Sequence, residues 1–161
     1  ITALFIPSLF GRLTYGLGLQ QGSGLLARYF VGEQAGVTPA HLVRIDREIN
    51  FGSVAELGAM PFPSTVVWTG KLVAPQTGQY LFTIEADDCG WLLIDGQSVI
   101  PDPGAVTKTH SAGQATLSRG AHRITVGERN IGGDAAIHLY WRPPHHDAEI
   151  VPSSALIPDR P

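Results

Sequence analysis

Alternation of apolar and polar positions predicts β-strands along most of this chain. In the segment 79–86 (QYLFTIEA), Tyr80, Phe82, Ile84 and Ala86 fall on one face of a strand, and the intervening residues fall on the other. Apolar runs or similar alternations predict further strands at 25–31, 64–74, 91–94, 98–100, 121–126 and 135–141. No stretch shows the 3.6-residue periodicity of an amphipathic helix, so we expect an all-β chain.

Turn-forming residues separate the predicted strands. The chain has 19 Gly and 12 Pro but only 16% charged residues, a composition typical of short strands joined by turns. Asp95-Gly96 predicts a two-residue hairpin turn. Residues 101–113 and 127–134 are rich in Gly or small polar residues and are predicted to be loops. Together these signals predict an antiparallel two-sheet β-sandwich.

The first 23 residues have a different character from the rest. They are rich in Leu, Ile, Phe and Gly, and with Pro7 and Arg12 they are too short and too interrupted to span a bilayer. One interpretation is the end of a membrane segment or signal region, with membrane attachment upstream of Ile1. Another is an apolar arm that docks on a partner, including further copies of this chain. We therefore divide the chain into an arm, 1–23, and a sandwich domain, 24–161.

Charge and chemistry exclude several classes of function. The net charge is −3 and the pI about 6.0, and basic clusters are missing, which argues against nucleic-acid binding. Cys89 is the single cysteine, so the chain has no internal disulfide, and we expect it to be half-buried. No Ser-His-Asp, Cys-His or phosphate-loop motif appears, and Glu128 with Asp134 shows no sign of an acid–nucleophile pair. The chain is predicted to be non-enzymatic.

The adjacent carboxylates Asp87-Asp88 are the strongest chemical signal, because such a pair needs a cation, N–H donors or open water. His145-His146-Asp147 also suggests a metal fragment, but no third ligand is fixed by spacing, so a solvated loop is expected. Trp91 comes three residues after Asp88, at the end of the acidic turn, and is the candidate aromatic contact for a sugar. The tryptophans at 68 and 141 have the phase of core residues.

Several motifs, in order, resemble the PA14 domain family, the β-sandwich module named after part of anthrax protective antigen. The resemblance runs from about Gly24 to Leu156. It rests on five segments: GLLARYF (24–30), RIDREINF (44–51), WTGKLVAPQTGQYLFTIEADDCGWLLIDG (68–96), LSRGAHRITV (117–126), and AAIHLYWRPP with VPSSAL (135–144 and 151–156). Each segment is weakly specific alone, but five in order are strong for the fold.

Membership of this family implies an exported module that often binds carbohydrate. In the yeast flocculin and adhesin branch, an Asp-Asp pair joined by a cis peptide binds Ca²⁺, and the ion holds sugar hydroxyls. The resemblance places the carboxylate ligands at Asp87 and Asp88, an amide ligand at Asn130, and backbone carbonyl ligands at Gly132 and Asp134. Ca²⁺ prefers oxygen ligands of these kinds. With Trp91, the two aspartates and the asparagine form the expected carbohydrate-binding set.

Three functions remain open at this point. The first is an extracellular, cell-surface or periplasmic module that recognises glycans with the help of Ca²⁺. The second is a self-assembling surface or filament subunit that uses residues 1–23 for subunit contacts, with a purely structural acidic pair. The third is an outward-facing accessory domain of a membrane glycosyltransferase. Two departures from the yeast pattern favour a structural pair: Cys89 stands where Gly or Ala is usual, and the loop 127–134 carries no aromatic residue.

Overall fold

The computed structural model describes residues 24–104 and 108–161. Within these ranges the chain is all-β, with one 3₁₀ turn at Ser153–Ala155. The strands are β1 (Leu25–Val31), β2 (Leu42–Asp46), β3 (Asn50–Phe51), β4 (Ser64–Ala74), β5 (Gly78–Asp87), β6 (Cys89–Ile94), β7 (Gln97–Ile100), β8 (Thr109–Leu117), β9 (Gly120–Asn130), β10 (Ala136–Arg142), β11 (Glu149–Ile150) and β12 (Leu156–Pro158).

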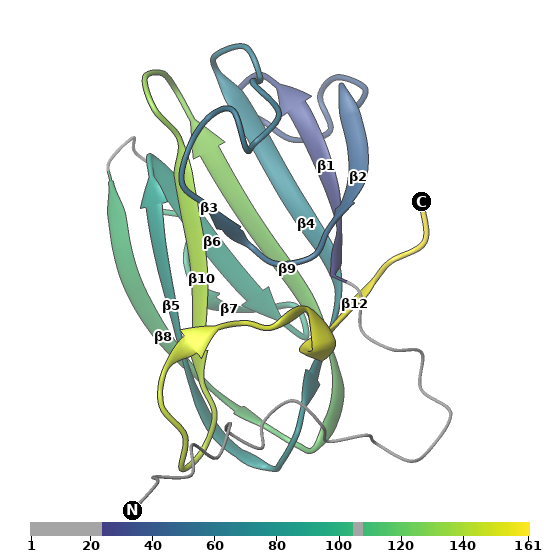
Figure 1. Ribbon diagram of the computed structural model, residues 1–161, viewed down its shortest axis with the longest axis vertical. Coiled ribbons are helices and arrows are strands. Elements are labelled where there is room, and N and C mark those ends of the chain that lie inside the picture. The colour runs from purple at the N-terminus through teal and green to yellow at the C-terminus, as the bar shows by residue number, and fades with distance from the viewer. Residues whose placement is uncertain (1–23, 105–107) are drawn as a thin grey trace, which may run out of the picture.

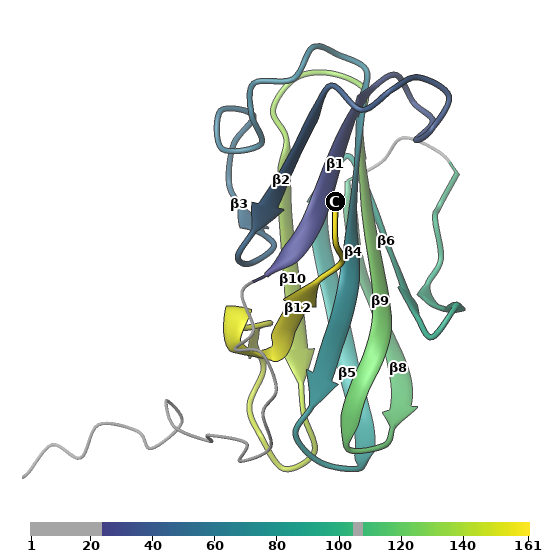
Figure 2. The same cartoon turned by 90° about the vertical axis from the view of Figure 1, so that its right-hand side faces the viewer.

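The strands form two antiparallel sheets that pack face to face as a sandwich (Figures 1 and 2). The first sheet has the order β2-β1-β4-β9-β6-β7, with β12 added beside β4. The second has the order β11-β10-β5-β8, with β3 beside β10. The expected two-sheet sandwich is therefore confirmed.

The core lies between the sheets and follows the predicted alternation. In β5, Tyr80, Phe82, Ile84 and Ala86 are buried and their neighbours along the strand are not. The tryptophans at 68 and 141 are also buried, as their phase predicted. Burial of these large side chains is the main favourable contribution to folding, at roughly 25 cal/mol per Å² of apolar surface.

Three local expectations were wrong. The loop expected at 127–134 begins only after Asn130, because β9 continues through 127–130. Residues 101–113 were expected to form a loop, but β8 begins at Thr109 and pairs with β5 from Gly78 to Ala86. Its sequence, THSAGQATL, is built of small and polar residues that carry little hydrophobic signal. Cys89 was expected to be half-buried and is fully buried at the start of β6.

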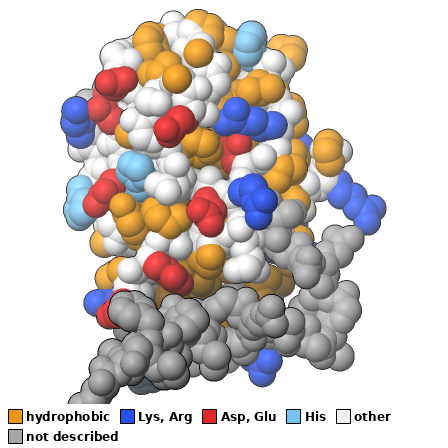
Figure 3. Space-filling model, in the orientation of Figure 1, with side chains coloured by type: hydrophobic (Ala, Val, Ile, Leu, Met, Phe, Trp, Pro, Cys, Tyr) orange, Lys and Arg blue, Asp and Glu red, His pale blue; other side chains and the backbone are white. Residues whose placement is uncertain are grey.

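The described surface shows no basic patch on the face seen in Figure 3, where acidic and basic side chains are interspersed. No helix among residues 24–104 and 108–161 is long and apolar enough to cross a membrane. The arm at 1–23 lies outside the described residues, so its separation from the sandwich stays a prediction.

A buried carboxylate, Asp46, ties together three strands of the larger sheet. Its oxygens accept hydrogen bonds from the Tyr29 hydroxyl (2.6 Å), the Trp68 indole (2.8 Å) and the Arg44 guanidinium (2.6 Å). Burial, reinforced by the carboxylate of Asp46, raises the pKa of Tyr29 far above its usual value. This network fixes β1, β2 and β4 in one register, because each donor comes from a different strand.

Replacing Asp46 should therefore be costly. We expect Asp46→Ala to lower the free energy of unfolding by about 3 kcal/mol. The reason is that the variant removes the oxygen atoms that accept hydrogen bonds from Tyr29, Trp68 and Arg44. Urea unfolding measures the loss. The exposed Asp147→Ala is the control for an equal loss of charge and should unfold almost as the parent does. Equal unfolding midpoints for the two variants would contradict this role of Asp46.

Candidate functional site

The acidic turn, which we define as Asp87 and Asp88, lies where the chain crosses from one sheet to the other. β5 of the smaller sheet ends at Asp87, and β6 of the larger sheet begins at Cys89. The Asp87–Asp88 peptide bond is cis. The crossing is at the upper end of the sandwich in Figure 1, next to the loop that joins β9 to β10. Both aspartates are partly exposed, so the turn is accessible to solvent.

The start of β8 holds the acidic turn in place. The backbone N–H of Thr109 donates to the carbonyl of Asp88 (3.1 Å), and the Thr109 hydroxyl accepts from the N–H of Gly90 (3.1 Å). The preceding residue, Lys108, places its ammonium 2.7 Å from a carboxylate oxygen of Asp87. A segment predicted to be a loop therefore supplies both a backbone clamp and a cation to the turn.

The loop at 130–134 packs directly against the acidic turn. The N–H of Ile131 donates to the Asp88 carboxylate (2.9 Å). Within the loop, the Asn130 side-chain oxygen accepts from the N–H of Gly132 (3.0 Å), and its amide donates to the carbonyl of Asp134 (3.4 Å). The structure thus brings the acidic pair and the loop of the predicted ligands into contact, although they are more than 40 residues apart in the sequence.

A further carboxylate lies beneath the turn. Glu128 is only 1% exposed, and its Oε1 has no hydrogen-bond partner. Burial raises the pKa of Glu128 to about 8, and the negative charges of Asp88 and Asp87 add to the shift. At neutral pH Glu128 is therefore mostly protonated, and the negative charge at this end of the sandwich is that of Asp87 and Asp88.

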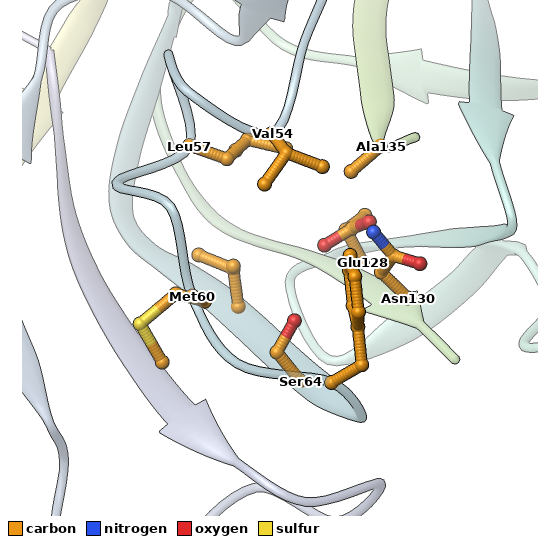
Figure 4. Close-up of a pocket in the computed structure, with 9 residues that line it drawn as sticks. Val54, Leu57, Met60, Ser64, Glu128, Asn130 and Ala135 are labelled. Carbon is orange, nitrogen blue, oxygen red and sulfur yellow. The ribbon is translucent and has the colours of Figure 1, made fainter. Parts of the chain in front are cut away.

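Figure 4 shows a small cavity into which Glu128 and Asn130 project from the same face of β9. Ser64 adds a hydroxyl, and the rest of the lining is mostly apolar: Val54, Leu57, Met60, Phe62, Val66 and Ala135. The cavity measures about 10 Å³, which is room for a single water molecule. It is too small for a sugar, so any glycan must bind at the exposed surface of the turn and loop.

Trp91 lies on a different face from Asn130. Its ring covers Gly127 on the outer face of the larger sheet, so closely that an added Cβ at Gly127 would lie 2.0 Å from the ring. The guanidinium of Arg129 stands 5.4 Å from the ring centroid and also pairs with Asp102 (2.7 Å). Asn130, by contrast, points between the sheets. Trp91 is thus at the flank of the candidate site, while the acidic turn and the loop form its centre.

The other sequence candidates lie elsewhere. His145, His146 and Asp147 belong to the connection between β10 and β11. They line an open, polar groove of about 340 Å³ together with Gln79, Leu81, Gln114, Arg142, Pro143 and Pro144. In the part of the chain that the structure describes, no three His, Cys, Asp or Glu side chains are grouped closely enough to hold a metal. A metal at the acidic turn would consequently depend on amide and carbonyl oxygens as well as on carboxylates.

Comparison with known proteins agrees with this architecture. A family model of the PA14 domain matches residues 22–155. No curated protein matches the chain. An anti-sigma factor domain-containing protein from Clostridium clariflavum is similar in structure, with 26% identity and a TM-score of 0.70 over 86% of this chain. This chain covers 49% of that protein, about half its length.

Two other solved structures share the fold at lower identity. The PA14 sugar-binding domain from an RTX adhesin has 21% identity and a TM-score of 0.70, over 85% of this chain and 99% of that one. An epithelial adhesin A domain from Candida glabrata, solved in complex with β-lactose, has 12% identity and a TM-score of 0.61, over 83% of this chain and 86% of that one. At these identities the likeness shows the fold alone.

The packing of Trp91 on Gly127 gives a direct test of this flank. In Gly127→Ala the new methyl group collides with the ring, so we expect the ring to be displaced and the free energy of unfolding to fall by about 1–3 kcal/mol. Acrylamide quenching should rise, because the other two tryptophans are buried. Gly132→Ala is the matched control, since its added Cβ meets nothing within 4 Å. Quenching and stability that match the parent protein would show that the ring does not lie over Gly127.

Proposed function

Because this chain belongs to the PA14 domain family, we propose that it is a carbohydrate-binding module that recognises glycans through Ca²⁺ at the acidic turn. The observation that carries the proposal is the contact of Asp88 with the N–H of Ile131. It joins two segments that contain oxygen ligands suited to Ca²⁺, although neither segment has enough of them alone. A sugar-binding domain of an RTX adhesin and an adhesin domain solved with β-lactose share this fold, and this motivates the choice of carbohydrate as the ligand.

The residues at the turn fit a calcium ion. Asp87 and Asp88 supply carboxylates, Asn130 an amide oxygen, and Gly132 and Asp134 backbone carbonyls, within the six to eight oxygens that Ca²⁺ takes. The Asn130 and Asp134 oxygens that already accept hydrogen bonds each keep a second lone pair. When bound, Ca²⁺ would supply open coordination positions for two neighbouring hydroxyls of a sugar.

The unpartnered Oε1 of Glu128 is a second reason to expect a cation. A buried oxygen without a hydrogen-bond partner is costly in a protein interior. With a pKa of about 8, Glu128 is mostly protonated at neutral pH, and a divalent ion above it would favour the charged form instead. Glu128 need not be a ligand for this effect, because the interaction of charges acts beyond contact distance.

The surface around the turn is open to a sugar. Gly132, Gly133 and Asp134 are exposed, and added side chains at the two glycines would meet no neighbour within 4 Å. The loop presents backbone and short polar groups, which suit hydrogen bonds to hydroxyls. A glycan would therefore bind at the upper end of the sandwich, with Trp91 and Arg129 at its flank. Such a module acts by binding and not by catalysis, outside the cytoplasm, where glycans are displayed.

Self-association is a second candidate, and one observation favours it. Among the described residues, four of the five exposed large hydrophobic side chains lie within 31–45: Val31, Val37, Val43 and Ile45. β2, which carries two of them, is an edge strand of the larger sheet. An exposed apolar edge can accept a strand from another chain. Deleting 1–23 and measuring mass by light scattering tests whether that segment joins copies together.

Calcium binding is the first test of the main proposal. We expect chelator-treated protein to bind Ca²⁺ in calorimetry and to gain about 2.7 kcal/mol of stability at a Ca²⁺ concentration of 100 Kd. Asp88→Asn should lose most of both effects, because it removes one of the two paired charges. Asp147→Asn, the same change on an exposed loop at the other end, should behave as the parent does. Absence of heat and of stabilisation at millimolar Ca²⁺ would contradict the metal part of the proposal.

Glycan recognition needs its own experiment. We expect the Ca²⁺-loaded protein to bind a subset of sugars on a glycan array, and EDTA to abolish the signal. The Asp88→Asn variant should bind no sugar on the array, even when Ca²⁺ is present. Binding that survives EDTA would keep the glycan function and remove the metal from it. An empty array for the loaded parent protein would contradict glycan recognition itself.

A further inference from the structure

The acidic turn already has a cation beside it. The ammonium of Lys108 lies 2.7 Å from an oxygen of Asp87, although the Lys108 side chain is 80% exposed and that of Asp87 only 23%. The hydrogen bond with Asp87 raises the pKa of Lys108, and the charges of Asp87, Asp88 and Asp134 add to the effect. The ammonium therefore interacts with the charges of three carboxylates. Asp87 and Asp88 are proposed to bind the metal through these carboxylates, and Asp134 through its backbone carbonyl.

The chain holds this ammonium close to the turn. Thr109, the next residue, is bonded through its N–H to the carbonyl of Asp88, and its hydroxyl meets the N–H of Gly90. These contacts fix the backbone at the root of the Lys108 side chain. A tethered group of this kind acts at a high effective concentration, so the ammonium stays within reach of the Asp87 carboxylate.

A calcium ion bound at the turn would compete with this ammonium for the carboxylate of Asp87. A Ca²⁺ ion bound to these carboxylate oxygens would lie 2.3–2.6 Å from them. The ion and the Lys108 ammonium would then be close together, and their positive charges would repel each other. The carboxylates of Asp88 and Asp134 keep this region negative even with the Lys108–Asp87 pair formed. The site thus retains a demand for positive charge that a single exposed ammonium does not meet.

We propose that Lys108 is a tethered competitor of Ca²⁺, which occupies the acidic turn in the absence of metal and is displaced when the metal binds. This inference rests on the proposed function, since it concerns regulation of the same site. Lys108 lowers the apparent affinity for Ca²⁺ and partly neutralises the acidic turn until the ion binds. Binding of the metal then releases the side chain to solvent at the rim, where a glycan would approach.

Calcium titration of Lys108 variants tests the competition. We expect Lys108→Gln, which keeps much of the side-chain length without its charge, to bind Ca²⁺ about three- to tenfold more tightly than the parent, a range set by the modest strength of exposed ion pairs. Lys108→Arg keeps the charge and should stay near the parent affinity. The chain has one other lysine, Lys71, on an exposed position of β4, so Lys71→Gln is the matched control for the change in net charge. It should leave the affinity unchanged.

Each outcome separates the inference from the function on which it rests. Tighter binding by Lys108→Gln alone supports both. Binding by Lys108→Gln but not by the parent protein supports the competition and shows that Lys108 has replaced the metal, which contradicts the calcium proposal for the natural chain. Equal affinities for the parent and Lys108→Gln overturn the competition and leave the calcium site intact. Absence of binding in all four proteins overturns both.

The displacement itself can be observed by NMR of the lysine side chains. The chain has two lysines, and Lys71→Gln identifies the signal of Lys108. We expect addition of Ca²⁺ to move the Lys108 ammonium resonance toward that of a solvated lysine while the Lys71 signal stays in place. A Lys108 signal that does not change while Ca²⁺ binds would show that the ammonium is not displaced, and would overturn the inference.

Discussion

Repulsion between carboxylates at one end of the sandwich is the constraint on which the account of this protein depends. Asp87 and Asp88 are adjacent, Asp134 lies within electrostatic range of the same ammonium, and Glu128 is buried below. Three features reduce this repulsion. The N–H of Ile131 donates to Asp88, the Lys108 ammonium pairs with Asp87, and the raised pKa of Glu128 favours its uncharged form. One ammonium beside the carboxylates of Asp87, Asp88 and Asp134 leaves a net negative charge at the turn, and this imbalance is the physical basis for expecting a cation.

The rest of the fold holds these groups at a fixed place. The turn is a crossing between two sheets, so its position follows from the packing of both sheets and not from the flexibility of a loop. Long ladders between β4 and β9 and between β5 and β8 set the ends of the strands that carry Glu128, Asn130 and Asp87. The buried Asp46 network, at the other side of the larger sheet, fixes β1 and β2 on the same frame. A site at the end of rigid strands keeps its carboxylates together even though they repel.

Sequence patterns predicted the β-sandwich fold better than they predicted the candidate site. Alternation identified β5 and β10 because their inward residues are large and apolar, whereas β8 was missed because its residues are small or polar. The acidic pair and Asn130 could be selected by resemblance to a family. Lys108 could not be, since nothing in its local sequence signals a partner 21 residues away. The burial of Glu128 and the outward face of Trp91 depend on which side of β9 and β6 meets the core, and the motif alone does not say this.

The most direct measurement is the position of the ion in crystals grown with Ca²⁺ and, in parallel, with a lanthanide that gives a strong anomalous signal. The account predicts one peak between the carboxylates of Asp87 and Asp88 and the Asn130 side chain, with oxygen distances of about 2.3–2.6 Å for Ca²⁺ and the Lys108 ammonium moved away from Asp87. A turn without a peak at saturating metal, with Lys108 still paired to Asp87, would contradict it. The acidic turn would then be a structural connection between the two sheets, stabilised by the ion pair of Asp87 with Lys108.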